Sequence, residues 1–560
     1  MGKGVKNILN KNCKIILIFY SLSFILWLFT IAITSINYLI PEDFLGSSGR
    51  LPIYFWLALI LVSLGIIKTY FINNLTLFYC GLVLLILILF MTYPLIEPSG
   101  RHPVSYQVSG ISEQIVDGTY LSCSYEIPWL GFPYIAYQGF PLFVTIFIEL
   151  TELPILTFIK FSPAFIILIT TFIIYAFYYN LSEKSNRALI AATLFVPLCY
   201  WHLFSVPELL TYALLPTFLF LVYLNSKKPY MRYSLLYICV LLSIIITHLL
   251  APFVIIIYSV IYNIINFFLR KINLNLSLLS IALFFCYLIY VGYRFYNNAI
   301  IFILESFENF DILTNRLTVG EIERSQSPER IIGIFANLSP LIICILISLL
   351  VISALILNKR YKSNTLMISY FMACLLLFLI PYGGDVNIGR TAYFINIGTA
   401  YFASCLPKNY IKPFFILIVI FILIHPIAYS GGGTKTSVIP ISELVGTKFF
   451  ADKTEEKIYY FSQSAKSIIY YQDPYNAFKR SSATLWYPPL AKFYLDKNFD
   501  YILHSVRDHT GLIYYLGYDP IFQNINKINN LFVKVYDSRN FEIYYKERSQ
   551  NETNTYNNGR

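Results

Sequence analysis

The sequence predicts a polytopic bundle of membrane-spanning α-helices followed by a small C-terminal α/β domain. Hydrophobic residues make up 57% of the 560 positions and charged residues only 13%, which is too few to cover the surface of a soluble protein of this length. Apolar runs of about 18 residues or more recur, and each is long enough to cross the hydrocarbon core of a bilayer as a helix. After about Gly431 these runs stop, and shorter strand-like segments replace them.

The length rule predicts about 13 crossings. The first run lacks a small-residue cleavage site, so we expect a signal-anchor span there. The expected spans are 14–36, 51–71, 76–96, 163–180, 188–204, 208–224, 233–250, 251–268, 276–297, 336–357, 365–382, 391–406 and 413–430.

Basic loops predict the orientation of these spans, because lysine and arginine favour the cytoplasmic side. The loops expected on that side are 1–14, 225–233, 269–275, 358–364 and 407–412. An odd number of crossings then puts the C-terminal part outside the cell. We therefore expect a multi-pass protein of the plasma membrane with a cytoplasmic N-terminus.

The segment 141–158 is apolar but carries Glu149, Glu152 and Pro154. Loop 97–140 is expected outside and loop 225–233 inside, so an odd number of crossings must separate them, yet four apolar runs lie between. The segment with two carboxylates is the weakest span, and we expect it to lie at the outer surface as a juxtamembrane or re-entrant helix. The alternative is that 141–158 crosses and another run does not.

The part after the membrane region is expected to form its own domain over 431–547, outside the cell. The stretch "SGGGTKTS" indicates a flexible linker, and "KIYYFS", "DYILHS" and "LFVKVYDSRNFEIYYKE" indicate strands, the last one a hairpin around Asp537–Asn540. Helices are expected near 463–471 and 484–496. The end, 548–560, has the composition of a disordered tail.

The net charge of +11 does not indicate a nucleic-acid partner, because the basic residues outside the tail mostly occupy the short loops that set orientation. Most of the nine cysteines lie within expected spans, so neither a disulfide framework nor a metal cluster is indicated. The long loops with unusual polar residues gather on the outer side. A membrane protein with this distribution is expected to act on that face.

Several short motifs follow one another in the order found in a known family. A span leads into an acidic outer loop, then "YQGFPLF", an apolar helix and "KFSPA"; later come "VPELL", "THLLAP", an Arg390 that precedes Tyr393, and the tail hairpin "VYDSRNFEIYY". This order resembles the GT-C superfamily of polytopic membrane glycosyltransferases, and the tail is similar to those of archaeal-type members. The resemblance implies a GT-C-like fold, transfer of a sugar from a polyprenyl-phosphate donor outside the cell, and an essential acid in the first outer loop.

The sequence departs from the family pattern at two places. An aspartate is expected about fifteen residues before Gly118, but no acidic residue stands there, and the WWDYG signature of oligosaccharyltransferases is absent. The candidates for the catalytic acid are therefore the other carboxylates of this region: Glu97, Glu113, Asp117, Glu149 and Glu152. The structural alternatives to a catalytic role are a charge at the membrane edge for Glu97 and a place on a solvated loop helix for Glu113 and Asp117.

Transfer of a sugar to a hydroxyl needs a base near the acceptor and a cation that holds the leaving lipid phosphate. Arg390 is the first candidate for the phosphate site, because it stands at the outer end of a span, with Lys160 and His248 as further candidates. A snorkelling arginine and a helix-end histidine are the structural alternatives. No ligand spacing predicts a metal site, and a divalent cation is left open as a cofactor.

We expect a glycosyltransferase that moves a hexose or pentose, with membrane lipid around it and a protein, lipid or glycan as acceptor. Two other classes remain open. A transporter or flippase of lipid-linked sugars would show broken helices and a polar path near mid-membrane. A catalytically inactive membrane scaffold would use its C-terminal part to bind a partner.

Overall fold

The computed structural model describes residues 3–36, 45–116, 118, 137–199, 207–248, 250–268, 275–291, 328–357, 364–377, 386–406, 408–430, 439–453, 459–460, 501–505, 533–538 and 541–545. The expected helices at 463–471 and 484–496, the linker 431–437 and the tail 548–560 lie outside these residues. Asp117 also lies outside them, and the side chain of Arg390 is not described.

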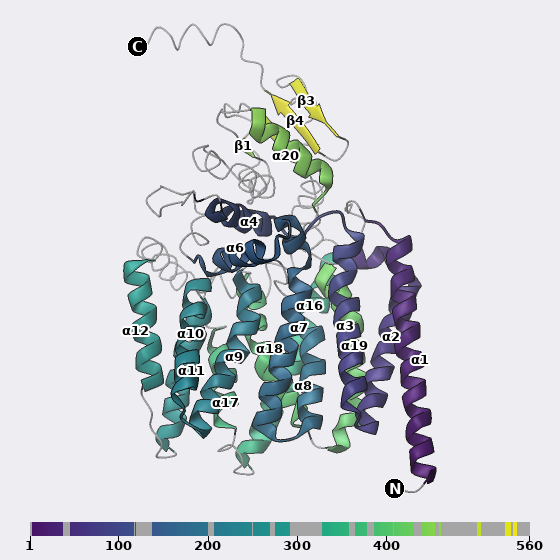
Figure 1. Cartoon of the computed structure of the whole chain (residues 1–560), viewed down its shortest axis with the longest axis vertical. Coiled ribbons are helices and arrows are strands. Elements are labelled where there is room, and N and C mark those ends of the chain that lie inside the picture. The colour runs from purple at the N-terminus through teal and green to yellow at the C-terminus, as the bar shows by residue number, and fades with distance from the viewer. Residues whose placement is uncertain are drawn as a thin grey trace.

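Long helices run side by side and form the body of the molecule, with α1 at one flank and α12 at the other (Figure 1). Each of the 13 segments that the sequence predicts as a span overlaps one of these helices. Their bounds are α1 Lys3–Ile33, α2 Ile53–Ile72, α3 Leu75–Ile96, α7 Ile155–Ser182, α8 Ser185–Leu198, α9 Pro207–Lys227, α10 Met231–Thr247, α11 Leu250–Phe268, α12 Asn275–Tyr290, α16 Pro328–Leu357, α17 Thr365–Leu377, α18 Val386–Ser404 and α19 Lys408–Ser430.

Seven of the described helices are long and apolar enough to cross a membrane: α2, α3, α7, α9, α11, and the greater parts of α1 and α19. Shorter apolar helices, among them α8, α10, α12 and α17, stand beside them. The prediction of a helical, multi-pass membrane protein is confirmed in this form, whereas the count of 13 crossings stays a prediction.

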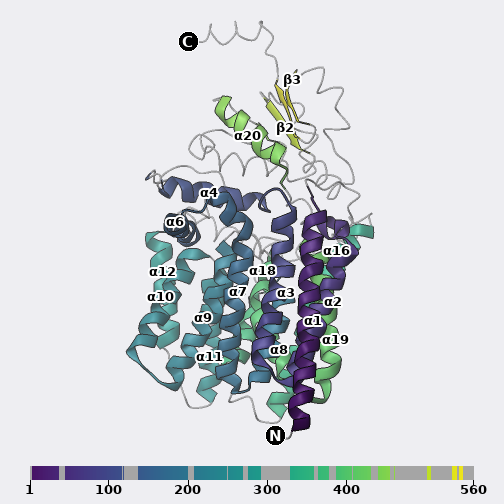
Figure 2. The same cartoon turned by 45° about the vertical axis from the view of Figure 1, so that its right-hand side comes forward.

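The two ends of the bundle differ, and Figures 1 and 2 show this from two directions. One end, called the lower end below, holds the N-terminus of α1. The opposite, upper end carries α4 Pro103–Val116 and α6 Gly139–Thr151, which lie across the tops of the long helices. The C-terminal strands lie beyond them on the same side. Both helices that cross the upper end come from the loop and segment that the sequence predicts to lie there.

The segment 141–158 does not form one helix in the structure. α6 ends at Thr151, Glu152 adopts a left-handed conformation with φ of 55°, and α7 begins at Ile155. Pro154 disfavours helical geometry at the residue before it, which explains the break at this place. Residues 155–158 therefore belong to the long helix α7, eight residues ahead of the span start expected at 163.

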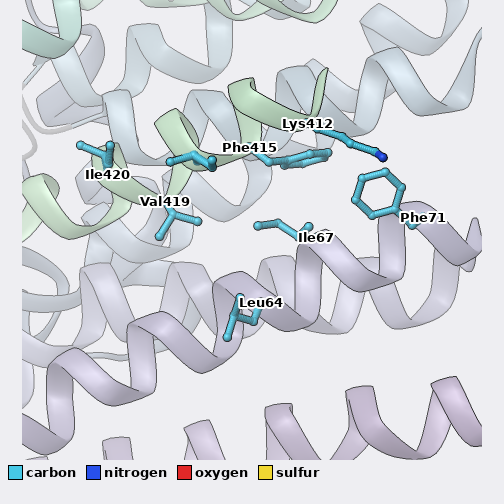
Figure 3. Close-up of a pocket in the computed structure, with 8 residues that line it drawn as sticks. Leu64, Ile67, Phe71, Lys412, Phe415, Val419 and Ile420 are labelled. Carbon is cyan, nitrogen blue, oxygen red and sulfur yellow. The ribbon is translucent and has the colours of Figure 1, made fainter. Parts of the chain in front are cut away.

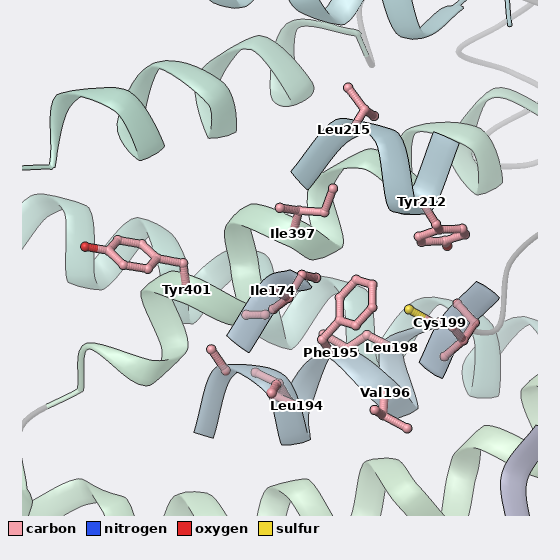
Figure 4. Packing of buried hydrophobic residues seen from close by; sticks show 14 of the residues in the cluster. Ile174, Leu194, Phe195, Val196, Leu198, Cys199, Tyr212, Leu215, Ile397 and Tyr401 are labelled. Atoms are coloured by element: carbon pink, nitrogen blue, oxygen red, sulfur yellow. The ribbon is translucent and has the colours of Figure 1, made fainter. Parts of the chain in front are cut away.

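The core is continuous along the bundle, and α8 lies inside it. All of the α8 side chains from Ala188 to Leu198 are buried, and Figure 4 shows Phe195 and Leu198 beside Tyr212 of α9 and Ile397 of α18. A helix that is apolar on every face is expected at such a central position. Because α8 contacts α7, α18 and α19, it holds elements that are far apart in the sequence.

The C-terminal part contains a four-stranded sheet in the order β1-β2-β4-β3, with bounds β1 Tyr459–Tyr460, β2 Tyr501–Ser505, β3 Val533–Asp537 and β4 Phe541–Tyr545. β1 pairs with β2 in parallel, and the other two pairs are antiparallel. The predicted strands and the hairpin around Asp537–Asn540 are confirmed. The helix α20 Ile441–Lys453, which contacts β4, was not predicted from the sequence.

Candidate functional site

Glu97 ends α3 at the upper end and forms a buried ion pair with Arg101. The guanidinium donates from Nε to Glu97 Oε2 at 2.7 Å and from Nη2 to Oε1 at 2.5 Å, so the contact is bidentate. Arg101 also donates to the backbone oxygen of Tyr429 at 3.1 Å and to Ser47 Oγ at 2.9 Å. Ser47 Oγ in turn donates to Glu97 Oε1 at 2.7 Å.

Aromatic rings complete the surroundings of Arg101. Its guanidinium carbon lies 4.4 Å from the centroid of Tyr93 and 4.8 Å from that of Tyr429. Burial disfavours the charged guanidinium, but the Glu97 carboxylate and its hydrogen bonds outweigh this and raise the pKa of Arg101 above its usual value. The pair links η1 Gly46–Arg50, α3 and α19. Since both oxygens of Glu97 already accept hydrogen bonds, we interpret this cluster as a structural clamp at the upper end.

A second pair of ionisable side chains is buried at the upper end, between α9 and α10. Glu208 lies in the first turn of α9, and His248 follows directly after the last residue of α10. Their relative exposures are 7% and 9%, and His248 Nε2 lies 3.4 Å from Glu208 Oε1. The other ring nitrogen, Nδ1, is buried and has no hydrogen-bond partner among the described residues.

The pair lies close to α18, on which Arg390 stands. The ring centroids of His248 and Phe394 are 6.3 Å apart. Arg390 precedes Phe394 by four positions within α18 (Val386–Ser404), so both stand on the same face of this helix. Arg390, whose side chain is not described, therefore stands one helical turn from the residue that lies beside His248. The sequence analysis did not select Glu208 as a site residue, although it stands in the motif "VPELL" at the start of a helix.

The helix α6 covers this region. It contacts both α9 and α10, and a side chain at Gly139 would meet Thr247 Oγ1 at 2.5 Å and the Thr247 backbone nitrogen at 2.9 Å. Thr145 Oγ1 donates to the Ser112 backbone oxygen of α4 at 3.1 Å. Phe140 and Val144 of α6 share a small apolar core with Val108 of α4 and with the start of α7.

We expect Gly139→Val to weaken the packing of α6 against α10. Overpacking where two backbones approach closely lowers the free energy of unfolding by about 1–3 kcal/mol. The apparent melting temperature of the protein in detergent measures this effect. Leu142→Val on the exposed side of the same helix is the matched control and should leave the melting temperature nearly unchanged. Equal melting temperatures of the two variants would contradict the close approach of α6 and α10.

The other carboxylate candidates that the structure describes are not fully buried. Glu113 is half-buried in the last turn of α4. Glu149 and Glu152 are exposed at the end of α6, where the chain turns before α7 begins. Lys160 is half-buried on α7 and interacts electrostatically with Glu97.

A metal site would need several ligands close together. Within the described residues, no three His, Cys, Asp or Glu side chains are grouped so that they could hold an ion.

The fold and composition define a multi-pass helical membrane protein. No protein-family model matches the chain, and no curated protein matches it. The fold is similar to the crystal structure of ArnT from Cupriavidus metallidurans bound to undecaprenyl phosphate, at 11% identity and a TM-score of 0.47, over 86% of this chain and 99% of that chain. The apo structure of the same protein gives 11% identity and a TM-score of 0.45, over 83% and 97% of the two chains. Likeness at this level assigns neither family nor activity.

Proposed function

We propose that this protein is a membrane glycosyltransferase of the GT-C kind. It takes a sugar from a polyprenyl-phosphate donor and transfers it to a hydroxyl acceptor at the upper, extracytoplasmic end of the bundle. The observation that carries the proposal is the buried Glu208–His248 pair, which lies next to the helix of Arg390 and beneath α6, and whose His248 Nδ1 has no hydrogen-bond partner among the described residues. The motif order in the sequence supports the same class.

The proposed chemistry divides between the imidazole and the cations. Glu208 favours a proton on Nε2 of His248, which leaves the lone pair on Nδ1 to accept the proton of the acceptor hydroxyl. The acceptor oxygen bonds to the anomeric carbon of the sugar while the bond from that carbon to the phosphate oxygen breaks. The electron pair leaves with the lipid phosphate, whose charge Arg390 holds.

The proposal also gives roles to carboxylates that the sequence predicts in the outer loop. Glu113 and Asp117 remain candidates for contact with the acceptor, and Lys160 remains a second cation for the phosphate. Glu149 and Glu152 are exposed and are the least favoured. Glu97 is held by Arg101, so the proposal gives it a structural role.

Release of polyprenyl phosphate from labelled polyprenyl-phosphate sugars tests the proposal directly. We expect the purified protein to turn over at least one such donor, and Arg390→Ala to lower the turnover by about a hundredfold or more, since loss of one group that stabilises developing charge has effects of that size. Glu113→Ala run in parallel shows whether the loop carboxylate is needed. Lys227→Ala, at the lower end, is the matched control for loss of a cation.

Absence of turnover and of binding with every donor would contradict the proposal and favour a transporter or a scaffold. Turnover that does not depend on Arg390 would leave the class standing and remove this residue from the phosphate site.

A further inference from the structure

A groove near the lower end of the bundle is separate from everything described at the upper end. It has a volume of about 370 Å³ and lies between α2 and α19. The lining from α2 consists of Leu64, Ile67 and Phe71, and that from α19 includes Phe415, Val419 and Ile420 (Figure 3). Both walls belong to helices that are long and apolar enough to cross a membrane.

The floor of the groove is made of packed side chains, whereas the residues along its edges are exposed. Phe415 is buried, and its ring packs against Tyr70 at 4.9 Å and Phe71 at 5.8 Å between centroids. Leu64, Phe71 and Ile420 are 44%, 55% and 43% exposed. The stretch from Leu64 to Phe71 extends about 10 Å along the helix. An exposed apolar groove on the side of a membrane protein faces hydrocarbon chains and not water.

One positively charged side chain, that of Lys412, lies at the end of this groove. Lys412, in the second turn of α19, is exposed and is the one charged residue among the described side chains that line the groove. Figure 3 shows its amine at the end of the groove next to the Phe71 ring. Because α19 starts at the lower end, the amine reaches the level at which lipid headgroups begin, as lysines near span ends do. Lys68 stands on α2 one turn before Phe71 and adds a second positive charge near this end.

We infer that this groove is a binding site for an anionic phospholipid of the leaflet at the lower end. One acyl chain lies between α2 and α19 against Phe415 and Val419, and the headgroup phosphate pairs with Lys412. The apolar walls accept any acyl chain, so the preference for an anionic headgroup comes from the cation at the end of the groove. The inference does not depend on the proposed transfer reaction, because the groove and the Glu208–His248 pair lie at opposite ends of the bundle.

Native mass spectrometry of the purified full chain tests this inference, with phosphatidylglycerol and phosphatidylcholine offered in competition. We expect the protein to retain phosphatidylglycerol preferentially. Lys412→Gln should weaken this retention about fivefold, the size expected for one lysine near a lipid surface. Lys227→Gln is the matched control, since Lys227 is another exposed lower-end lysine but does not line the groove.

A second variant tests whether the acyl chain of the lipid lies in the groove. Val419→Trp fills the groove and should displace the retained lipid, whereas Leu57→Trp, at another exposed position on α2, should not. Equal retention of phosphatidylglycerol by the wild type, Lys412→Gln and Val419→Trp would overturn the inference. So would a dimer of the lipid-free protein that Val419→Trp dissociates, because a second copy would then occupy the groove.

Discussion

Replacement of His248 by glutamine is expected to reduce sugar transfer by about 10²- to 10⁴-fold, the usual contribution of a positioned general base. The side chain of glutamine has a similar reach but cannot accept a proton at neutral pH. We expect the decrease to appear in kcat, with little change in donor binding, because the proposed mechanism has the imidazole act on the acceptor hydroxyl. Steady-state kinetics with a labelled donor measure both quantities.

The matched control for this variant is His425→Gln. His425 is also buried, and its Nδ1 lies 3.1 Å from the backbone oxygen of Pro197, deep in the bundle. Loss of transfer in His248→Gln but not in His425→Gln would support a chemical role. Glu208→Gln should lower kcat by a smaller factor, since it removes only the charge that orients the ring. Unchanged kcat in His248→Gln would contradict the proposed base.

Replacement of Arg101 by alanine is expected to destabilise the protein by about 3–5 kcal/mol, because it leaves the buried Glu97 carboxylate without its partner. Arg101 is 7% exposed and Glu97 3% exposed, so water cannot readily replace the lost contacts. The apparent melting temperature and the resistance of the folded protein to proteolysis measure the loss. Arg50→Ala, at an exposed arginine in the neighbouring short helix, is the control and should have little effect.

A double variant separates the structural role of Glu97 from a catalytic one. Glu97→Leu combined with Arg101→Met removes both charges, and we expect much of the stability lost in Arg101→Ala to return. If Glu97 is structural, the double variant also retains sugar transfer. A stable but inactive double variant would show that Glu97 itself takes part in the reaction and would contradict our interpretation of the clamp.

Much of the fold follows from patterns that are local in the sequence. Long apolar runs predict helices wherever they occur, and the alternation around Asp537–Asn540 predicts the β3–β4 hairpin, because both depend on neighbouring residues only. Glu149, Glu152 and Pro154 predict a helix that is not a span; in the structure α6 ends at Thr151 and lies across the upper end of the bundle. The composition alone determined that the protein belongs in a membrane.

The candidate site required the tertiary structure, since its residues meet through packing of distant helices. Nothing in the sequence pairs Glu208 with His248, and nothing links Arg101 to the Tyr429 backbone, which is 328 positions away. Local rules place a charge at a helix end, but they do not state whether that charge is buried or which group faces it. The sequence by itself determined a helical membrane protein, because apolar runs are a local property of the chain. Only the packing of helices decided which carboxylate is held by an arginine and which one lies beside an imidazole.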